Sequence, residues 1–126
     1  MNINYKGIIW LGIFVEDLEN SIKFYEDILE FNLLGRKDSY AHFDAGGGSL
    51  LELFSGGKKA VSAKSPKLQS TMSALLVENL EQTKSILKEK GVVFTDNEGT
   101  FENMHWATLV DPEENCIEIK QIDITS

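Results

Sequence analysis

Several residue types are scarce in this chain of 126 residues, and each scarcity excludes something. The single cysteine, Cys116, rules out an intrachain disulfide and a multi-cysteine zinc site, so a reducing compartment such as the cytoplasm is expected. Lysine and arginine number 12 against 20 acidic residues, and the net charge of -8 argues against binding to phosphate backbones. No apolar run reaches the roughly 20 residues that a membrane-spanning helix needs. Neither nucleic acid nor a membrane is therefore an expected partner.

What remains is the composition of one globular domain. Hydrophobic residues make up 42% of the chain and charged residues 25%. A chain of this length can bury a core without disulfides or metal ions. Residues 7–15 are apolar like the core of a signal peptide, but they lack a small-residue cleavage site and run into an acidic helix start. We interpret residues 7–16 as a strand that is covered on both faces.

A repeat organises the chain. The segment WLGIFVEDLENSIKFY, residues 10–25, returns 62 positions later as MSALLVENLEQTKSIL, residues 72–87. Both copies combine an alternating apolar strand with a helix-capping residue, Asp17 or Asn79. Leu18, Ile22, Tyr25 and Leu29 give the first helix a buried stripe, and Gly91 ends the second helix. The sequence therefore predicts a duplicated strand–helix unit.

Short strands are expected after each helix. In the first half these are FNLLGRKDS, YAHFDA and SLLELF, and a turn at Gly46–Gly48 places His42 opposite Glu52. In the second half they are VVFTD, HWATLV and CIEIKQI, with DPEEN as a turn. We therefore expect a single domain, residues 1–126, made of repeats at about 7–55 and 70–122. The connection 56–69 is rich in glycine, lysine and serine and is either a mobile lid or a linker.

A βαβββ unit used twice, opened by VEDLENSIKFYEDIL and closed by DPEENCIEIKQ, resembles the vicinal oxygen chelate superfamily. This group includes glyoxalase I, bleomycin-resistance proteins, fosfomycin-resistance enzymes and extradiol dioxygenases. The resemblance covers about residues 8–122 and implies an α+β fold, in which two βαβββ modules form an eight-stranded cup-shaped mixed sheet. The concave face of the cup would hold a small-molecule ligand. The resemblance also implies a homodimer, although two modules of one chain could complete the cup.

Metal-using members of this superfamily place metal ligands on the first and last strands of each module. The matching positions are Trp10 and Glu52 in the first half and Met72 and Glu118 in the second. Tryptophan offers no lone pair, and a thioether is a poor ligand for hard divalent ions. The usual four-ligand site is therefore broken, and no cofactor is expected. The alternative is one divalent metal ion held by Glu52, Glu118 and His42.

The candidate pocket combines carboxylates with aromatic rings. If Glu52 and Glu118 face one cup, their negative charges favour a positive group beside them, whether a ligand, a protonated His42 or a metal. Aromatic faces attract cations and stack on flat rings. His42, Glu52 and Glu118 are the catalytic candidates, with pocket walls as the alternative reading. Cys116 is interpreted as buried filler, and strand parity turns His105 away from the cup. The complete candidate pocket is Trp10, Phe14, Tyr40, His42, Glu52, Phe54, Met72, Trp106 and Glu118.

The sequence thus favours a metal-independent protein that binds a small cationic or aromatic molecule, like the bleomycin- and antibiotic-resistance branch of the superfamily. A metal-dependent lyase, isomerase or dioxygenase of the glyoxalase type, with a rearranged site, is the alternative. A ligand sensor or interaction module without chemistry is a third reading.

Overall fold

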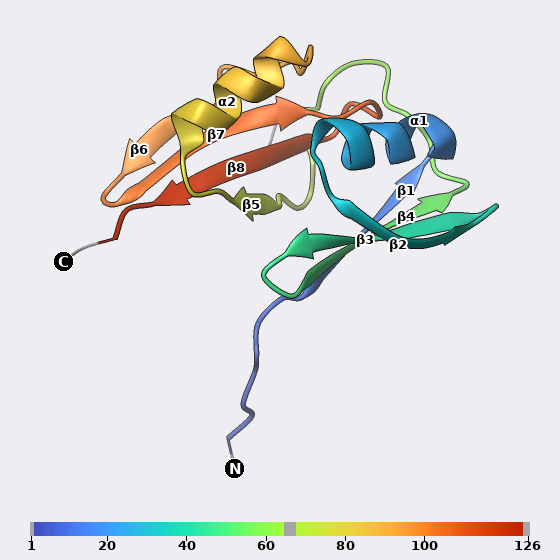
Figure 1. The fold of residues 1–126 in the computed structure, drawn as a ribbon, viewed down its shortest axis with the longest axis horizontal. Coiled ribbons are helices and arrows are strands. Elements are labelled where there is room, and N and C mark those ends of the chain that lie inside the picture. Colours follow the sequence, from blue (N-terminus) through green and yellow to red (C-terminus); the bar gives the residue numbers. More distant parts are fainter. Residues whose placement is uncertain (1, 65–67, 125–126) are drawn as a thin grey trace. The chain divides into compact units, whose positions relative to one another are not determined.

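The computed structural model describes residues 2–64 and 68–124, and the chain divides into two compact units, residues 1–57 and 58–126. Each unit runs strand, helix, strand, strand, strand (Figure 1). The predicted α+β class and the duplicated βαβββ order are confirmed. Each unit builds a four-stranded mixed sheet with a helix on one face.

Unit 1 has the strand order β1-β4-β3-β2, with β1 and β4 parallel and the other pairs antiparallel. The first strand is shorter than expected, because residues 2–9 are exposed and only the carbonyl of Ile9 continues the pairing, by accepting from Leu50 N–H. The strands are β1 (Trp10–Val15), β2 (Asn32–Lys37), β3 (Tyr40–Gly46) and β4 (Ser49–Ser55).

The helix of unit 1 begins where its cap was predicted, since Asp17 Oδ1 accepts the Asn20 N–H at 3.0 Å. Helix α1 (Leu18–Lys23) passes directly into a π-helical turn, η1 (Phe24–Ile28). In the predicted stripe Leu18, Ile22 and Tyr25 are buried and Leu29 is half-buried. The wider π turn also buries Phe24, which a 3.6-residue period did not select.

The core of unit 1 lies between this helix and the sheet. Leu51 and Leu53 point toward the helix, and both are buried. Val15, Ala41 and Phe43 from the neighbouring strands share that face and are fully buried. Side chains alternate across a strand, so the residues between these positions lie on the opposite face, which we call the open face of unit 1.

Unit 2 has the strand order β5-β8-β7-β6, again with the first and last strands parallel. Asn79 Oδ1 caps helix α2 by accepting the Gln82 N–H at 2.9 Å, and Gly91, with φ of 89°, follows the end of the helix. Both predicted helix ends are therefore confirmed. The elements are β5 (Ala74–Leu76), α2 (Leu80–Glu89), β6 (Gly99–Phe101), β7 (Met104–Val110) and β8 (Cys116–Ile122).

One predicted strand of unit 2 is wrong. VVFTD, residues 92–96, makes only an isolated bridge from Phe94 to Leu109, and the regular strand β6 starts later, at Gly99. The side chains of Asn97 and Thr108 explain the interruption. Thr108 Oγ1 donates to the Asn97 carbonyl at 2.8 Å and accepts from Asn97 Nδ2 at 3.1 Å. These bonds replace regular pairing, and the fully buried Thr108 holds the irregular segment against β7.

The predicted connection 56–69 contains residues 65–67, which lie outside the described residues. The described residues on both sides of this segment form hydrogen bonds with the first residue of β8 and the turn before it. Lys64 N–H donates to the Glu114 carbonyl at 3.2 Å, and the Gln69 amide bonds both backbone groups of Cys116 at 2.8 Å. In the described part of the chain, no helix is long and apolar enough to cross a membrane.

Candidate functional site

The open face of unit 1 gathers six of the nine candidate pocket residues. The strand register places His42 directly opposite Glu52, as predicted, and Tyr40 opposite Phe54. In the parallel pair, Phe14 lies beside Phe54 and Gly12 beside Glu52. The six residues on this face are Trp10, Phe14, Tyr40, His42, Glu52 and Phe54.

Glu52 makes its hydrogen bond with a tryptophan. The indole Nε1 of Trp10 donates to Glu52 Oε1 at 2.9 Å. The indole lies flat over Gly12, where an added Cβ would come within 2.2 Å of the ring carbon Cη2. The missing side chain at residue 12 therefore allows Trp10 to reach across β1 to the carboxylate on β4.

His42 makes no hydrogen bond with Glu52, although the two residues are in register. Its ring lies over Gly35 on β2, 3.1 Å from an added Cβ, and stacks near Tyr40 with centroids 6.3 Å apart. The side chain thus leans away from β4, while the indole of Trp10 occupies one carboxylate oxygen of Glu52. Register alone predicted the neighbours but not the direction of either side chain.

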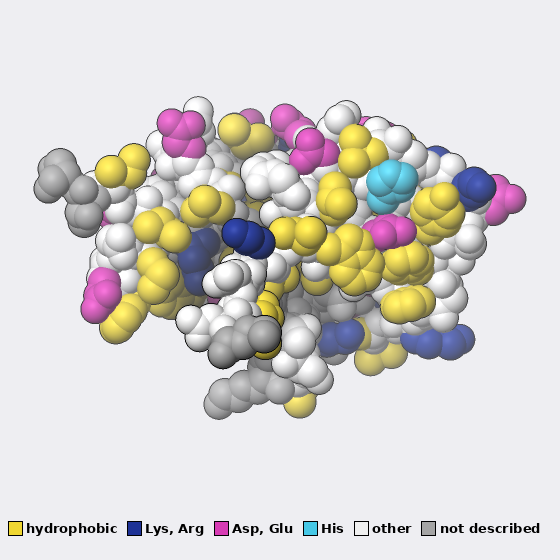
Figure 2. Space-filling model, turned by 90° about the horizontal axis from the view of Figure 1, so that it is seen from below, with side chains coloured by type: hydrophobic (Ala, Val, Ile, Leu, Met, Phe, Trp, Pro, Cys, Tyr) yellow, Lys and Arg dark blue, Asp and Glu magenta, His cyan; other side chains and the backbone are white. Residues whose placement is uncertain are grey.

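The aromatic residues of this face form a partly exposed surface. Phe14 and Phe54 stack with centroids 5.2 Å apart, and Trp10 lies 6.3 Å from Phe54. Phe14 is 67% exposed and Trp10 46%, so the expectation that both faces of the first strand are covered is wrong for this face. Figure 2 shows apolar side chains gathered around a histidine and an acidic side chain on the side where the sheet of unit 1 lies. Solvent-exposed aromatic surface of this kind is typical of a binding site.

In unit 2, Glu118 and Trp106 lie on one face of the sheet and share a cation. Lys120 Nζ is 3.2 Å from Glu118 Oε1 and 5.9 Å from the centre of the Trp106 ring. Trp106 itself lies over Gly99 on β6, 2.8 Å from an added Cβ. Sequence reasoning gave Lys120 no role, although a spacing of two on a strand places its side chain on the same face as that of Glu118. Lys120, on the same strand β8, thus supplies the positive charge that pairs with Glu118.

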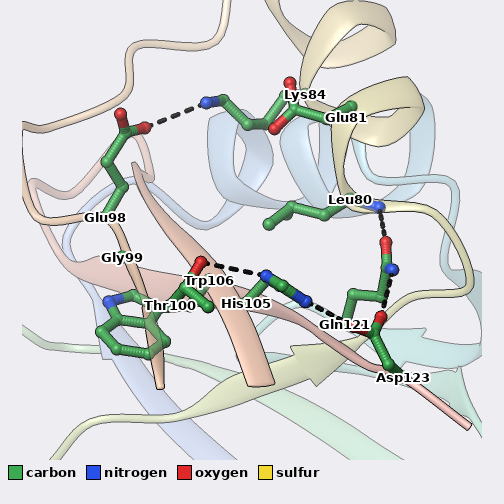
Figure 3. Close-up of a pocket in the computed structure, with 10 residues that line it drawn as sticks. All are labelled: Leu80, Glu81, Lys84, Glu98, Gly99, Thr100, His105, Trp106, Gln121 and Asp123. Carbon is green, nitrogen blue, oxygen red and sulfur yellow. Dashed lines mark hydrogen bonds and ion pairs between the residues drawn. The ribbon is translucent and has the colours of Figure 1, made fainter. Parts of the chain in front are cut away.

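The remaining candidates are held by other groups. The sulfur of Met72 lies 3.5 Å from Gln69 Nε2. Cys116 is buried, and its thiol donates to the Lys64 carbonyl at 2.7 Å. Burial, together with the negative charges of Asp111 and Glu114, raises the pKa of this thiol, which opposes a nucleophilic role. His105 bonds Thr100 and Asp123 (Figure 3). It lies on the face of the sheet opposite Glu118 and Trp106, as strand parity predicted.

The sequence of this chain matches one known protein family. Residues 7–119 match the family model described as the Glyoxalase/Bleomycin resistance protein/Dioxygenase superfamily. The chain belongs to this superfamily. No curated protein matches the chain.

Solved structures of superfamily proteins share the fold. A glyoxalase family protein from Bacillus anthracis aligns with a TM-score of 0.78 at 15% identity, covering 98% of this chain and 100% of its own. A lactoylglutathione lyase from Agrobacterium tumefaciens aligns with a TM-score of 0.74 at 15% identity, covering 93% and 94%. A superfamily protein from Alicyclobacillus acidocaldarius aligns with 0.74 at 18% identity, covering 94% and 93%. At these identities the likeness establishes the fold alone.

The metal positions of the superfamily do not fit a metal ion in this chain. At the first of them the Trp10 indole donates a hydrogen to Glu52, where a ligand would have to offer a lone pair. At the third, Met72 offers a thioether, which hard divalent ions bind poorly. At the fourth, Glu118 is paired with Lys120. Among the described residues, no group of three or more His, Cys, Asp or Glu side chains has the geometry to hold a metal.

Proposed function

We propose that the open face of unit 1 binds a small organic cation with an aromatic part, and that binding does not use the four-position metal site. The hydrogen bond from Trp10 to Glu52 carries this proposal. It orients the carboxylate and occupies Oε1, while Oε2 has no partner among the described residues. An ammonium or amidinium group is the natural donor to that second oxygen.

The rings around Glu52 supply the rest of the recognition. Phe14 and Phe54 present stacked faces, and Trp10 adds a third ring beside them. Aromatic faces attract cations, and flat ring systems stack on them with centroids about 4.5–7 Å apart. A ligand with a positive charge and a flat ring would therefore satisfy both the carboxylate and the exposed aromatic surface. The acidic net charge of -8 favours its approach.

Titration of a panel of cationic aromatic antibiotics, bleomycin among them, tests the proposal. The chain has two tryptophans, so Trp106→Phe leaves Trp10 as the reporter of fluorescence changes. At least one cation should quench or shift the emission of Trp10 and raise the melting temperature. Glu52→Gln, which keeps the shape but removes the charge, should weaken that binding about tenfold or more. Neutral ring analogues serve as controls, and a panel without any response would contradict the proposal.

A metal-dependent lyase, isomerase or dioxygenase is the second candidate. The register of His42 opposite Glu52 is the observation that favours it, since a rearranged site could use these two residues. Elemental analysis of protein purified without chelator tests this candidate. Stoichiometric nickel, zinc, manganese or iron that is lost in Glu52→Gln would establish it in place of the metal-independent reading.

We further propose that the protein is a cytoplasmic homodimer with a role in antibiotic resistance. Membership of the superfamily supports the dimer, because members of this size commonly complete their cups from two chains. The single, buried cysteine supports a reducing compartment. A monomer in light scattering at micromolar concentration would contradict the dimer. Unchanged drug tolerance in a sensitive host that expresses the chain would contradict the resistance role.

A further inference from the structure

A pocket lies within unit 2, beside the N-terminal end of α2 and strands β6, β7 and β8, with a volume of about 510 Å³. Of the nine residues predicted for the ligand pocket, only Trp106 lines it. We propose that this pocket is a nucleophilic site, in which His105 activates the hydroxyl of Thr100 for acyl transfer from small esters.

The hydrogen bonds around His105 assign its protons. His105 Nε2 lies 2.7 Å from Asp123 Oδ2, and Nδ1 lies 3.0 Å from Thr100 Oγ1 (Figure 3). An ionised carboxylate only accepts, so in the neutral ring Nε2 carries the hydrogen and Nδ1 keeps its lone pair. The Thr100 hydroxyl then donates to Nδ1. This is the order of nucleophile, base and orienting acid that activates a hydroxyl in enzymes.

Two further bonds hold the acid in place. Gln121 Nε2 donates to Asp123 Oδ1 at 2.9 Å, and Gln121 Oε1 accepts the backbone N–H of Leu80 at 2.7 Å. The hydrogen bonds from His105 and Gln121 hold the pKa of Asp123 below its ordinary value of 3.8. Asp123 therefore stays ionised at neutral pH, and a chain of bonds from α2 to β8 fixes the orientation of the imidazole.

The walls of the pocket limit the substrate. Lys84 and Glu98 form an ion pair at 2.9 Å on the wall away from Thr100 (Figure 3). With Glu81 and Asp123 also present, carboxylates outnumber the single lysine, so an anionic substrate is disfavoured. Leu80 supplies apolar surface from α2. A small uncharged aryl or alkyl ester fits this lining, and Thr100 is exposed to it.

The reaction is a hydrolysis in two steps. Thr100 Oγ1 bonds to the ester carbonyl carbon, its proton moves to His105 Nδ1, and the bond to the leaving oxygen breaks as that oxygen takes the proton. Water then attacks the acyl-threonine, giving a proton to Nδ1, and Thr100 regains its hydroxyl hydrogen as the carboxylic acid leaves. One ester and one water thus give one acid and one alcohol.

Hydrolysis of p-nitrophenyl acetate by the full chain tests the proposal. Thr100→Val, which keeps the shape and removes the hydroxyl, should lower the rate about 100-fold, the scale of general-base catalysis. Thr71→Val makes the same change at an exposed threonine outside the pocket and should leave the rate unchanged. Thr100→Ser should retain activity. Equal rates for the wild type and Thr100→Val would overturn the proposal.

Two further measurements separate chemistry from folding. Asp123→Asn should lower kcat with little change in KM, because an amide donor facing Nε2 moves the ring hydrogen to Nδ1 and blocks proton transfer. Acid quenching during turnover, followed by peptide mass spectrometry, should find the acetyl group on Thr100. An acetyl group found only on lysines, or a loss in Asp123→Asn confined to KM, would overturn the assignment even if a variant folds poorly.

Discussion

Trp10 Nε1 donates a 2.9 Å hydrogen bond to Glu52 Oε1, and so links the first and last strands of unit 1 through their side chains. The indole stands at the position where metal-using relatives place a ligand. This position therefore holds a hydrogen-bond donor to Glu52 in place of a metal ligand that donates a lone pair.

Loss of this donor should cost little stability. In Trp10→Phe a smaller aromatic ring remains and the N–H is lost, so the free energy of unfolding should fall by about 0.5–1.5 kcal/mol more than the loss of ring area alone causes, the usual net value of one hydrogen bond. Trp106→Phe is the matched control, since its indole makes no hydrogen bond among those described, and it should change stability less. Urea denaturation measures both. Equal losses in the two variants would show that the Trp10 bond adds nothing.

Gly12→Ala should displace the indole. The new Cβ would lie 2.2 Å from Trp10 Cη2, which no side chain tolerates, so the ring has to leave its place above the strand. In a Trp106→Phe background the emission of Trp10 should shift, and ligand affinity should fall about as much as in Glu52→Gln. Gly35→Ala is the comparison, because its Cβ would meet the ring of His42 at 3.1 Å and leave Trp10 alone. An unchanged emission spectrum in Gly12→Ala would contradict the described position of the indole.

The ion pair between Glu19 and Arg36 predicts a pH dependence. The hydrogen bond from Arg36 lowers the pKa of Glu19 below its ordinary value of 4.5. A lowered folded-state pKa stabilises the protein above the unfolded value, and this contribution disappears as the pH falls through the folded value. Arg36→Gln should therefore destabilise the protein near pH 7 but not at the lowest pH, and NMR titration should show Glu19 returning toward 4.5. Lys37→Gln serves as the control, and an identical Glu19 titration in Arg36→Gln would contradict the pairing.

Thr108→Val tests the irregular segment of unit 2. The substitution keeps the shape but removes both bonds to Asn97 and leaves a carbonyl without its donor. Stability should fall by about 1–3 kcal/mol, the cost of an unpaired buried polar group. Thr71→Val makes the same change on the surface and should have almost no effect. Similar urea midpoints for the two variants would show that Thr108 does not hold the segment.

The sequence predicted those features that depend on backbone geometry. Asp17, Asn79 and Gly91 mark helix ends through local hydrogen bonds and backbone conformation, so their roles follow from position alone. The pairing of His42 with Glu52 follows in the same way from the glycine turn and the period of two in a strand.

What escaped prediction depends on side-chain direction and on tertiary contacts. Residues 92–96 have strand composition, but the bonds between Asn97 and Thr108 compete with regular pairing. The turn of Trp10 toward Glu52 required Gly12 to be recognised as space for a ring. The hydrogen-bonded series of Thr100, His105 and Asp123 joins β6, β7 and the residue after β8. These three residues do not form a recognisable sequence motif.

The ring of Trp10 resting on Gly12 also provides a marker for finding related proteins. A tryptophan followed two positions later by glycine on the first strand, with glutamate retained on the strand beside it, should identify superfamily members that share this arrangement. Members with histidine at the first position and a bulkier residue two places on should instead keep the lone pair that a metal needs. Sorting genomes by this pair of positions would divide the superfamily by chemistry before any protein is purified.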